Sequence, residues 1–364
     1  MRKRGRGALI AVCLVALILF GVIYETWSTL TTVFEPPAAG QTRQIALVIQ
    51  QGESTSQIAD ELYAKGLIRN PLAFRIWARI KGLDTQLQAG AYILTPGMNT
   101  DAIIAKLLNG QPDEQRLLVV DGYRLEQIAH YANKMGLSNF NEQDFLNYTH
   151  HPDQFPDKAK YPLLHNLKSM EGLLYPDTYL IPVNYNAVQV IDMMLDETNQ
   201  VVQANNLVAL AQQHGLNEYQ MLTLASIVQH EASNAGQMPL IAGIYLKRIQ
   251  HPSPDIGGPM LQSDPTVEYA RDTDTPPSTI GGYWIDLNSS GTGPSVDPHS
   301  PWNTYTHPGW PPTPISSPSL LAMKASASPA ATNCYFFFTK PSDGSLVCEP
   351  TYTQIVRDQQ KYLH

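Results

Sequence analysis

Three stretches of this sequence share one pattern: IALVIQQGESTSQIADELYAKGL at residues 45–67, AYILTPGMNTDAIIAKLLNG at 91–110 and LLVVDGYRLEQIAHYANKMGL at 117–137. Each reads as an apolar strand, a glycine-containing turn and an amphipathic helix. A glycine stands where each helix is expected to end, at Gly66, Gly110 and Gly136. One strand and one helix cannot bury a core alone, so the first two units are predicted to pack together as a small α+β module over residues 45–110.

The rest of the chain changes character in steps. Residues 113–185 are mixed and rich in aromatic side chains, and residues 188–231 have a helical pattern throughout. Residues 252–318 are crowded with Pro and Gly, which predicts loops and short strands. We therefore expect an α+β protein of two folded units, in which residues 111–364 form a larger α+β domain with a loop-rich C-terminal part.

The N-terminal residues predict a membrane anchor. Residues 7–24, GALIAVCLVALILFGVIY, carry no charge and are about as long as a helix that crosses a bilayer. Basic residues within 1–6 precede this run, which predicts that residues 1–6 form a cytoplasmic tail and that the chain after the span is exported. The predicted single-pass span is 7–24, and residues 25–44 are predicted to be a linker. A cleaved signal peptide is the alternative, but the residues that follow Tyr24 lack a small-x-small cleavage site.

The charge balance argues against nucleic acid as a partner. The chain has 24 Lys plus Arg against 32 Asp plus Glu, a net charge of −8. No cluster of Lys and Arg of the kind that binds phosphate backbones follows Arg6.

Two of the three cysteines form a natural pair. Cys13 lies in the apolar N-terminal run, whereas Cys334 and Cys348 flank a turn at residues 341–345 and are expected on adjacent strands. In an oxidising compartment they are predicted to form a disulfide. Two free buried thiols are the alternative.

One carboxylate stands out on the helix predicted for residues 218–231. Asn217 is a good N-cap, and Glu231 lies in line with Val228, Ile227 and Leu224, on the apolar side. Burial and the negative end of the helix dipole both raise the pKa of a carboxyl group. Glu231 is therefore a candidate general acid; the alternative is a structural partner of a nearby Arg.

Other hydrolytic chemistries fit less well. His230-Glu231 begins a zinc-protease motif, but Asn234 stands where its second His is needed. No Gly-x-Ser-x-Gly motif occurs. The sequence predicts neither a metal nor another cofactor.

Several ordered segments resemble the family of YceG-like endolytic murein transglycosylases. VDGYRLEQIA at 120–129 resembles the segment that opens the family's catalytic domain, and EGLLYPDTY at 171–179 matches the block E-G-x-x-x-P-D-T-Y. LASIVQHEA at 224–232 resembles the catalytic-helix block A-S-I-V-E-K-E, in which the family's general acid falls on Glu231 and Gln229 replaces the first Glu. Other stretches of this chain also resemble parts of the family: LQAGAYILTPGMNTDAIIAKLLNGQ, LQSDPTVEY, PWNTYTHPGWPPTPISSP and the hairpin between Cys334 and Cys348.

The resemblance implies a LysM-like module at 45–110 and a catalytic domain at 111–364 that cuts between N-acetylmuramic acid and N-acetylglucosamine in peptidoglycan. A hydrolase normally needs two carboxylates, about 5–9.5 Å apart, whereas a lytic enzyme can use one. That one group protonates the leaving oxygen and then takes the proton of the 6-hydroxyl, which leaves a 1,6-anhydro end. The resemblance also implies association with cell-wall synthases and the trimming of nascent strands.

The expected glycan-binding residues come from two polar triplets. They are predicted to face each other across the cleft, with local turn capping as the alternative: Gln262, Ser263 and Asp264, and Asn303, Thr304 and Tyr305. Two further buried carboxylates are expected to be structural, with Asp177 capping a turn and Glu171 pairing with an Arg such as Arg248.

Two other functions remain open at this point. The chain could be a non-catalytic peptidoglycan-binding scaffold in which Gln229 marks a degenerate site. It could also be a muramidase that pairs Glu231 with Asp264 or Glu171.

Overall fold

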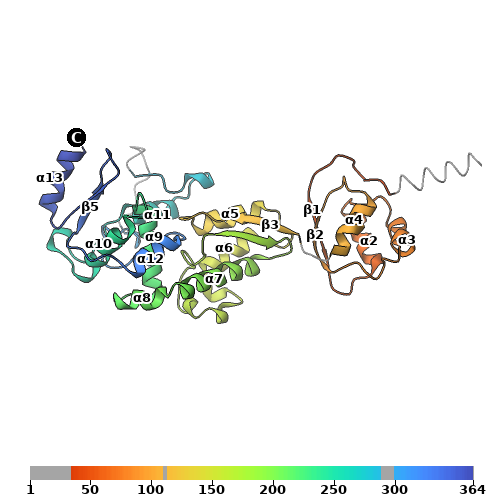
Figure 1. The fold of residues 1–364 in the computed structure, drawn as a ribbon, viewed down its shortest axis with the longest axis horizontal. Helices are drawn as coiled ribbons and strands as arrows, with labels where there is room; N and C mark the ends of the chain where they lie inside the picture. The colour runs from red at the N-terminus through yellow and green to blue at the C-terminus, as the bar shows by residue number, and fades with distance from the viewer. Residues whose placement is uncertain (1–33, 110–112, 288–298, 364) are drawn as a thin grey trace, which may run out of the picture. The chain divides into compact units, whose positions relative to one another are not determined.

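The computed structural model describes residues 34–109, 113–287 and 299–363, which form two compact units (Figure 1). Unit 1 reaches Gln115 and adds residues 136–138 and 182–184, and unit 2 contains the rest of the described chain. No helix in these ranges has both the length and the apolar character needed to span a membrane. The anchor predicted at 7–24 and the helix end predicted at Gly110 lie outside the described residues.

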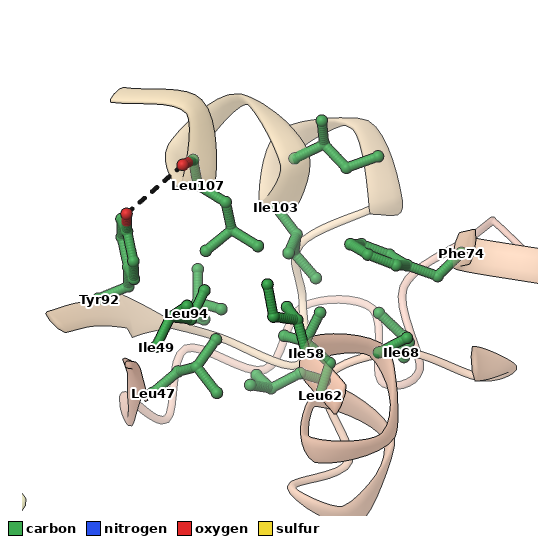
Figure 2. Close-up of a cluster of buried hydrophobic side chains, with 13 residues drawn as sticks. Leu47, Ile49, Ile58, Leu62, Ile68, Phe74, Tyr92, Leu94, Ile103 and Leu107 are labelled. Atoms are coloured by element: carbon green, nitrogen blue, oxygen red, sulfur yellow. Dashed lines mark hydrogen bonds between the residues drawn. The ribbon is translucent and has the colours of Figure 1, made fainter. Parts of the chain in front are cut away.

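Unit 1 is built on two antiparallel strands, β1 (Ile45–Ile49) and β2 (Gly90–Leu94), paired from Ile45 opposite Leu94 to Ile49 opposite Gly90. Three helices complete it: α2 (Thr55–Ala64), α3 (Pro71–Ile80) and α4 (Thr100–Asn109). Figure 2 shows strand and helix side chains meeting in one core, which includes Leu47, Ile58, Leu62, Phe74, Leu94 and Ile103.

The sequence pattern predicted α2 and α4 but missed α3. The N-cap bond from the Ala73 N–H to Asn70 and the proline at the first helical position are ordinary start signals. The helix was missed because the predicted pattern passed from the helix that ends at Gly66 directly to the strand at residue 91. In the structure Phe74 and Ala78 are buried, whereas Ile76 and Ile80 are exposed.

Unit 2 contains most of a two-stranded sheet of β3 (Glu114–Leu118) and β4 (Thr178–Pro182), drawn side by side in Figure 1. In the sequence, the segment between these two strands contains α5 (Leu125–Lys134), α6 (Glu142–His150) and three short 3₁₀ turns, η1 (Pro152–Gln154), η2 (Lys158–Lys160) and η3 (Pro162–Leu164).

The helical stretch predicted for 188–231 consists of α7 (Ala187–Ala204), α8 (Leu207–Gln213) and α9 (Glu218–Glu231). Every residue of α9 from Met221 to Val228 is buried. It contacts α10 (Met238–Gln250), α11 (Asp264–Asp274) and α12 (Leu320–Ala327). The apolar side predicted for Glu231 thus belongs to a helix that is buried on all sides between its first and last turns.

The stretch 252–318 is not only loops and short strands, as the Pro and Gly content predicted. It contains η4 (Pro254–Ile256), the 11-residue helix α11 and η5 (Ile280–Gly282). Pro265 stands in the first turn of α11, where proline costs no hydrogen bond, so it starts this helix instead of breaking it.

The C-terminal part is a hairpin of β5 (Phe336–Thr339) and β6 (Leu346–Glu349), followed by α13 (Tyr352–Tyr362). A disulfide joins Cys334 to Cys348, with 5.6 Å between their Cα atoms. Phe336 and Ile355 pack with Ile256 in a small core of their own, which fixes the hairpin against the turn at η4.

Candidate active site

Glu231 is the last residue of α9, and one of its carboxylate oxygens is held by two hydroxyl groups. Oε1 accepts hydrogen bonds from the Ser263 hydroxyl, at 2.6 Å, and from the Tyr245 hydroxyl. Ser263 precedes α11 and Tyr245 lies on α10, so three separate helices meet at this carboxyl group. Tyr245 and Ser263 are almost fully buried, whereas Glu231 itself keeps some exposure.

Burial is the main influence on the acidity of Glu231, and it raises the pKa of this carboxyl group. The bonds from Ser263 and Tyr245 lower the pKa, the negative charge of Asp264 raises it, and Arg248 lowers it. The net result is a raised pKa, which favours the protonated acid. In a protonated carboxyl group the carbonyl oxygen is the better acceptor, so two bonds to Oε1 place the proton on Oε2.

Arg248 positions the segment that carries Ser263. Arg248 is 5% exposed, and its guanidinium donates to the backbone oxygens of Leu261 and Gln262, the latter at 3.3 Å, and of Tyr335 at 2.7 Å. Gln262 has a φ of 52°, a left-handed conformation that is unfavourable for a non-glycine residue. The three carbonyl contacts compensate for that cost and turn Ser263 toward Glu231.

The two predicted triplets lie against each other. The Gln262 N–H donates to the Thr304 carbonyl at 3.1 Å, and the Ser263 N–H donates to Thr304 Oγ1 at 3.0 Å. The Tyr305 hydroxyl donates to Asp264 Oδ1 at 2.7 Å. Both triplets are therefore next to Glu231, through Ser263.

The six residues differ in exposure, and their contact with glycan stays a prediction. Ser263, Asn303 and Thr304 are buried, and their side-chain oxygens are used inside the protein. These three hold the two segments together and have almost no surface left for a sugar. The triplet members with surface that a ligand could contact are Gln262, Asp264 and Tyr305.

Glu171 and Asp177 differ from expectation in different ways. Asp177 is exposed rather than buried, and its carboxylate accepts from the N–H of its neighbour Thr178 at 2.6 Å. Glu171 is fully buried, but its cationic neighbour is Arg124, not Arg248. The Arg248 guanidinium donates instead to backbone carbonyl groups, and these bonds brace the turn before α11.

Burial raises the pKa of Glu171 well above the usual value, and the charge of Glu126 adds to the effect. The folded protein therefore binds this proton more tightly than the unfolded chain, so ionisation opposes folding. The contribution is fully present below the unfolded pKa and is lost as pH rises through the folded pKa. Glu171→Gln should unfold at a temperature that depends less steeply on pH over that window, measured by thermal denaturation at several pH values. Equal slopes for both proteins would contradict a protonated Glu171.

The two residues before Glu231 anchor the end of α9. Gln229 Oε1 accepts the N–H of Ser319, the N-cap of α12, at 3.0 Å. The His230 ring stacks on the Trp284 indole with ring centres 3.8 Å apart, and burial lowers its pKa to about 4, so it is neutral near pH 7. On another side His230 meets Gly122, where an added Cβ would lie 3.0 Å from the ring.

Trp284 is itself held in a costly conformation. Its φ is 65°, which is rare for a bulky side chain. The backbone N–H of Trp284 donates to Asp272 Oδ2 at 3.0 Å, and Arg271 donates to the Ile285 carbonyl at 2.7 Å and to Asp272 at 2.8 Å. Two buried charged residues of α11 thus fix the loop that covers His230, which limits the movement of Glu231.

Sequence reasoning missed Tyr245, Trp284 and Glu268. Tyr245 is 14 residues from Glu231 and reads as one more apolar position on a helix. Burial raises the pKa of Glu268, one turn after Asp264, to about 7. Within the described ranges, no three His, Cys, Asp or Glu side chains gather closely enough to hold a metal ion.

The family model of the YceG-like family matches residues 47–361. This chain belongs to the YceG-like family. An endolytic murein transglycosylase from Bacillus subtilis is 28% identical over 345 residues, which cover 91% of this chain and 88% of that protein. One from Streptococcus pneumoniae is 27% identical over 85% of this chain and 57% of its own length. A crystal structure of a YceG-like protein from Listeria monocytogenes superposes with a TM-score of 0.52 at 27% identity, covering 86% of this chain and 99% of that one.

Proposed function

We propose that this protein is an endolytic transglycosylase of peptidoglycan, with Glu231 as its single catalytic acid and base. The observation that carries the proposal is the environment of Glu231: a carboxyl group with a raised pKa, some remaining exposure, and two hydroxyl groups bonded to one of its oxygens. The similarity to proteins named endolytic murein transglycosylases supports the substrate and the reaction type.

The same geometry serves both halves of a lytic reaction. In the first half Oε2 gives its proton to the glycosidic oxygen between N-acetylmuramic acid and N-acetylglucosamine. The resulting carboxylate is stabilised by the Ser263 and Tyr245 hydroxyls, because a bond to a charged acceptor is stronger than one to a neutral acceptor. In the second half the carboxylate takes the proton of the muramic acid 6-hydroxyl, whose oxygen closes the 1,6-anhydro ring. The proton count is restored without water.

Gln229 does not weaken this proposal. Its side-chain oxygen serves as a hydrogen-bond acceptor for the Ser319 N–H, a role that needs no negative charge. A Glu at this position could accept the same bond. The position therefore braces α9 against α12, and the absence of a second carboxylate there leaves Glu231 able to act.

Removing either hydroxyl should shift the pH profile in a defined direction. Each bond favours the carboxylate and lowers the pKa of Glu231. Tyr245→Phe and Ser263→Ala should therefore raise this pKa further. The reaction starts from the protonated acid, so the alkaline limb of the kcat profile should move to higher pH in both variants, while the maximal kcat falls because the carboxylate loses a donor. Ser54→Ala, which removes the N-cap side chain of α2 in unit 1, is the control. An alkaline limb that stays fixed would argue against Glu231 as the titrating acid.

A two-carboxylate muramidase is the second candidate, and one observation favours it: the charge of Asp264 acts on Glu231. Asp264 is exposed, and Tyr305 donates to its Oδ1, so its Oδ2 would be the oxygen that activates water. Glu171 is buried beside Arg124 and Tyr269, away from solvent. Product analysis separates the functions, because lytic cleavage gives anhydro ends, hydrolysis gives reducing ends, and a binding scaffold gives neither.

The remaining parts of the proposal concern location. An apolar anchor at residues 7–24 would hold the protein in the cell membrane with both units outside the cytoplasm. Unit 1 has its own core and would serve as a LysM-like glycan-binding module. Family resemblance adds cell-wall synthases as partners. Together these would place Glu231 near strands as they are made.

A further inference from the structure

The outer face of α3 is apolar although it is not part of the core. Leu72, Ile76 and Ile80 are 56%, 50% and 70% exposed. They follow each other at intervals of four residues, so they lie in one row along the helix. The packing of unit 1 is satisfied by Phe74 and Ala78 on the opposite side and gives no reason for this row.

Two arginines, Arg75 and Arg79, lie beside the row. The other basic residues of this stretch are already engaged: Lys65 by Glu61, Lys81 by Asp101 and Arg69 by the Pro36 carbonyl. The Arg79 side chain is 84% exposed, and its contact with Asp84 is long, at 3.9 Å. A helix with large apolar side chains next to exposed cations is the pattern that binds the surface of an anionic membrane.

A hollow beside the row has the same mixed character. Its volume is about 310 Å³, and it is lined by Thr55, Leu72, Arg75, Ile76, Arg79 and Asp84. Guanidinium groups bind phosphate through paired donors, and the adjoining Leu and Ile offer apolar surface. The two arginines and the apolar rim suit a phospholipid headgroup with the start of its acyl chains, with the Asp84 carboxylate as the anionic group of the lining.

The chain also enters unit 1 at α3. The Phe34 ring packs on Trp77 of α3 with ring centres 4.9 Å apart, and Arg69 donates to the Pro36 carbonyl at 3.1 and 2.8 Å. Phe34 follows the apolar run at 7–24 by ten residues. At about 3.4 Å per residue these can extend no more than about 35 Å. The proposed anchor would therefore keep α3 close to the bilayer.

We propose that the face of α3 formed by Leu72, Ile76, Ile80, Arg75 and Arg79 docks on the surface of an anionic phospholipid bilayer. Docking would hold unit 1 against the membrane from which its anchor emerges. The proposal rests on the proposed anchor only for this proximity. It is independent of the chemistry at Glu231.

The test uses residues 34–364, which contain both units and lack the apolar run. We expect this protein to sediment with vesicles made of phosphatidylcholine and phosphatidylglycerol. It should not sediment with vesicles made only of phosphatidylcholine. Salt should release it from the anionic vesicles, because screening weakens exposed charge contacts. The double variant Ile76→Ser/Ile80→Ser and the variant Arg79→Glu should each bind at least roughly tenfold more weakly. Leu180→Ser on β4, where the leucine is 57% exposed, is the matched control and should bind normally.

Three results would overturn the proposal. In the first, the unmodified protein does not bind the anionic vesicles. In the second, the double variant binds these vesicles as well as the unmodified protein does. In the third, the double variant loses glycan binding but still binds the vesicles. The last result would make this face a sugar-binding surface. Cleavage of soluble glycan by the same variants should be unchanged, so an error in the proposed catalytic function would appear separately.

Discussion

Replacing Glu231 with Gln should lower the rate of anhydro-end formation by roughly 10²–10⁴-fold, the usual contribution of a general acid. Gln keeps the shape and a carbonyl oxygen that can accept from Ser263 and Tyr245, so the junction of α9, α10 and α11 should remain folded. It has no proton to give to the glycosidic oxygen. The measurement is the release of 1,6-anhydromuropeptides from purified glycan strands, followed by mass spectrometry.

Glu218→Gln is the matched control because Glu218 begins the same helix, is partly exposed like Glu231, and has a pKa that burial also raises. It should retain normal turnover. Substantial anhydro-product release by Glu231→Gln would remove Glu231 from the mechanism. Reducing ends from the unmodified protein would instead favour the muramidase, and Asp264→Asn would then identify its second carboxylate.

Local signals in the sequence were enough to place the helix that carries Glu231 and the ends of two others. Asn217 and Gln220 form the capping box at the start of α9, and that helix ends at Glu231. The glycines that end the first and third predicted units, Gly66 and Gly136, both have a φ of 71°, the left-handed conformation expected after a helix. These features depend only on neighbours within about four residues, so pattern analysis can find them.

Contacts between residues far apart in the chain could not be predicted from the sequence. The partner of Glu171 depends on whether Arg124 or Arg248 reaches it, and neither spacing nor charge decides between them. The burial of Ser263 and Thr304 arises because two distant segments close on each other through backbone bonds. Tyr245 and Trp284 act through contacts that only the folded chain creates.

Gly243→Ala should destabilise unit 2 by about 3 kcal/mol, at the upper end of the usual cost of overpacking. A Cβ at Gly243, on α10, would lie only 2.0 Å from the backbone oxygen of Ala330. Contacts of this kind need at least about 3 Å, so one backbone must shift by about 1 Å. The gain in helix propensity from Gly to Ala is about 1 kcal/mol and cannot offset the clash.

The shift should also reach the active site. Tyr245 and Arg248 lie on α10 within five residues of position 243, and Lys247 donates to the Thr332 carbonyl at 3.0 Å, which ties this helix to the displaced segment. Thermal denaturation should show a lower unfolding temperature, and kcat measured well below that temperature should fall because the Tyr245 hydroxyl moves relative to Glu231. Gly281→Ala is the control, since a Cβ there meets nothing within 4 Å. If Gly243→Ala unfolded at the temperature of the unmodified protein, close contact between α10 and residue 330 would be wrong, and so would the packing that presents Tyr245 to Glu231.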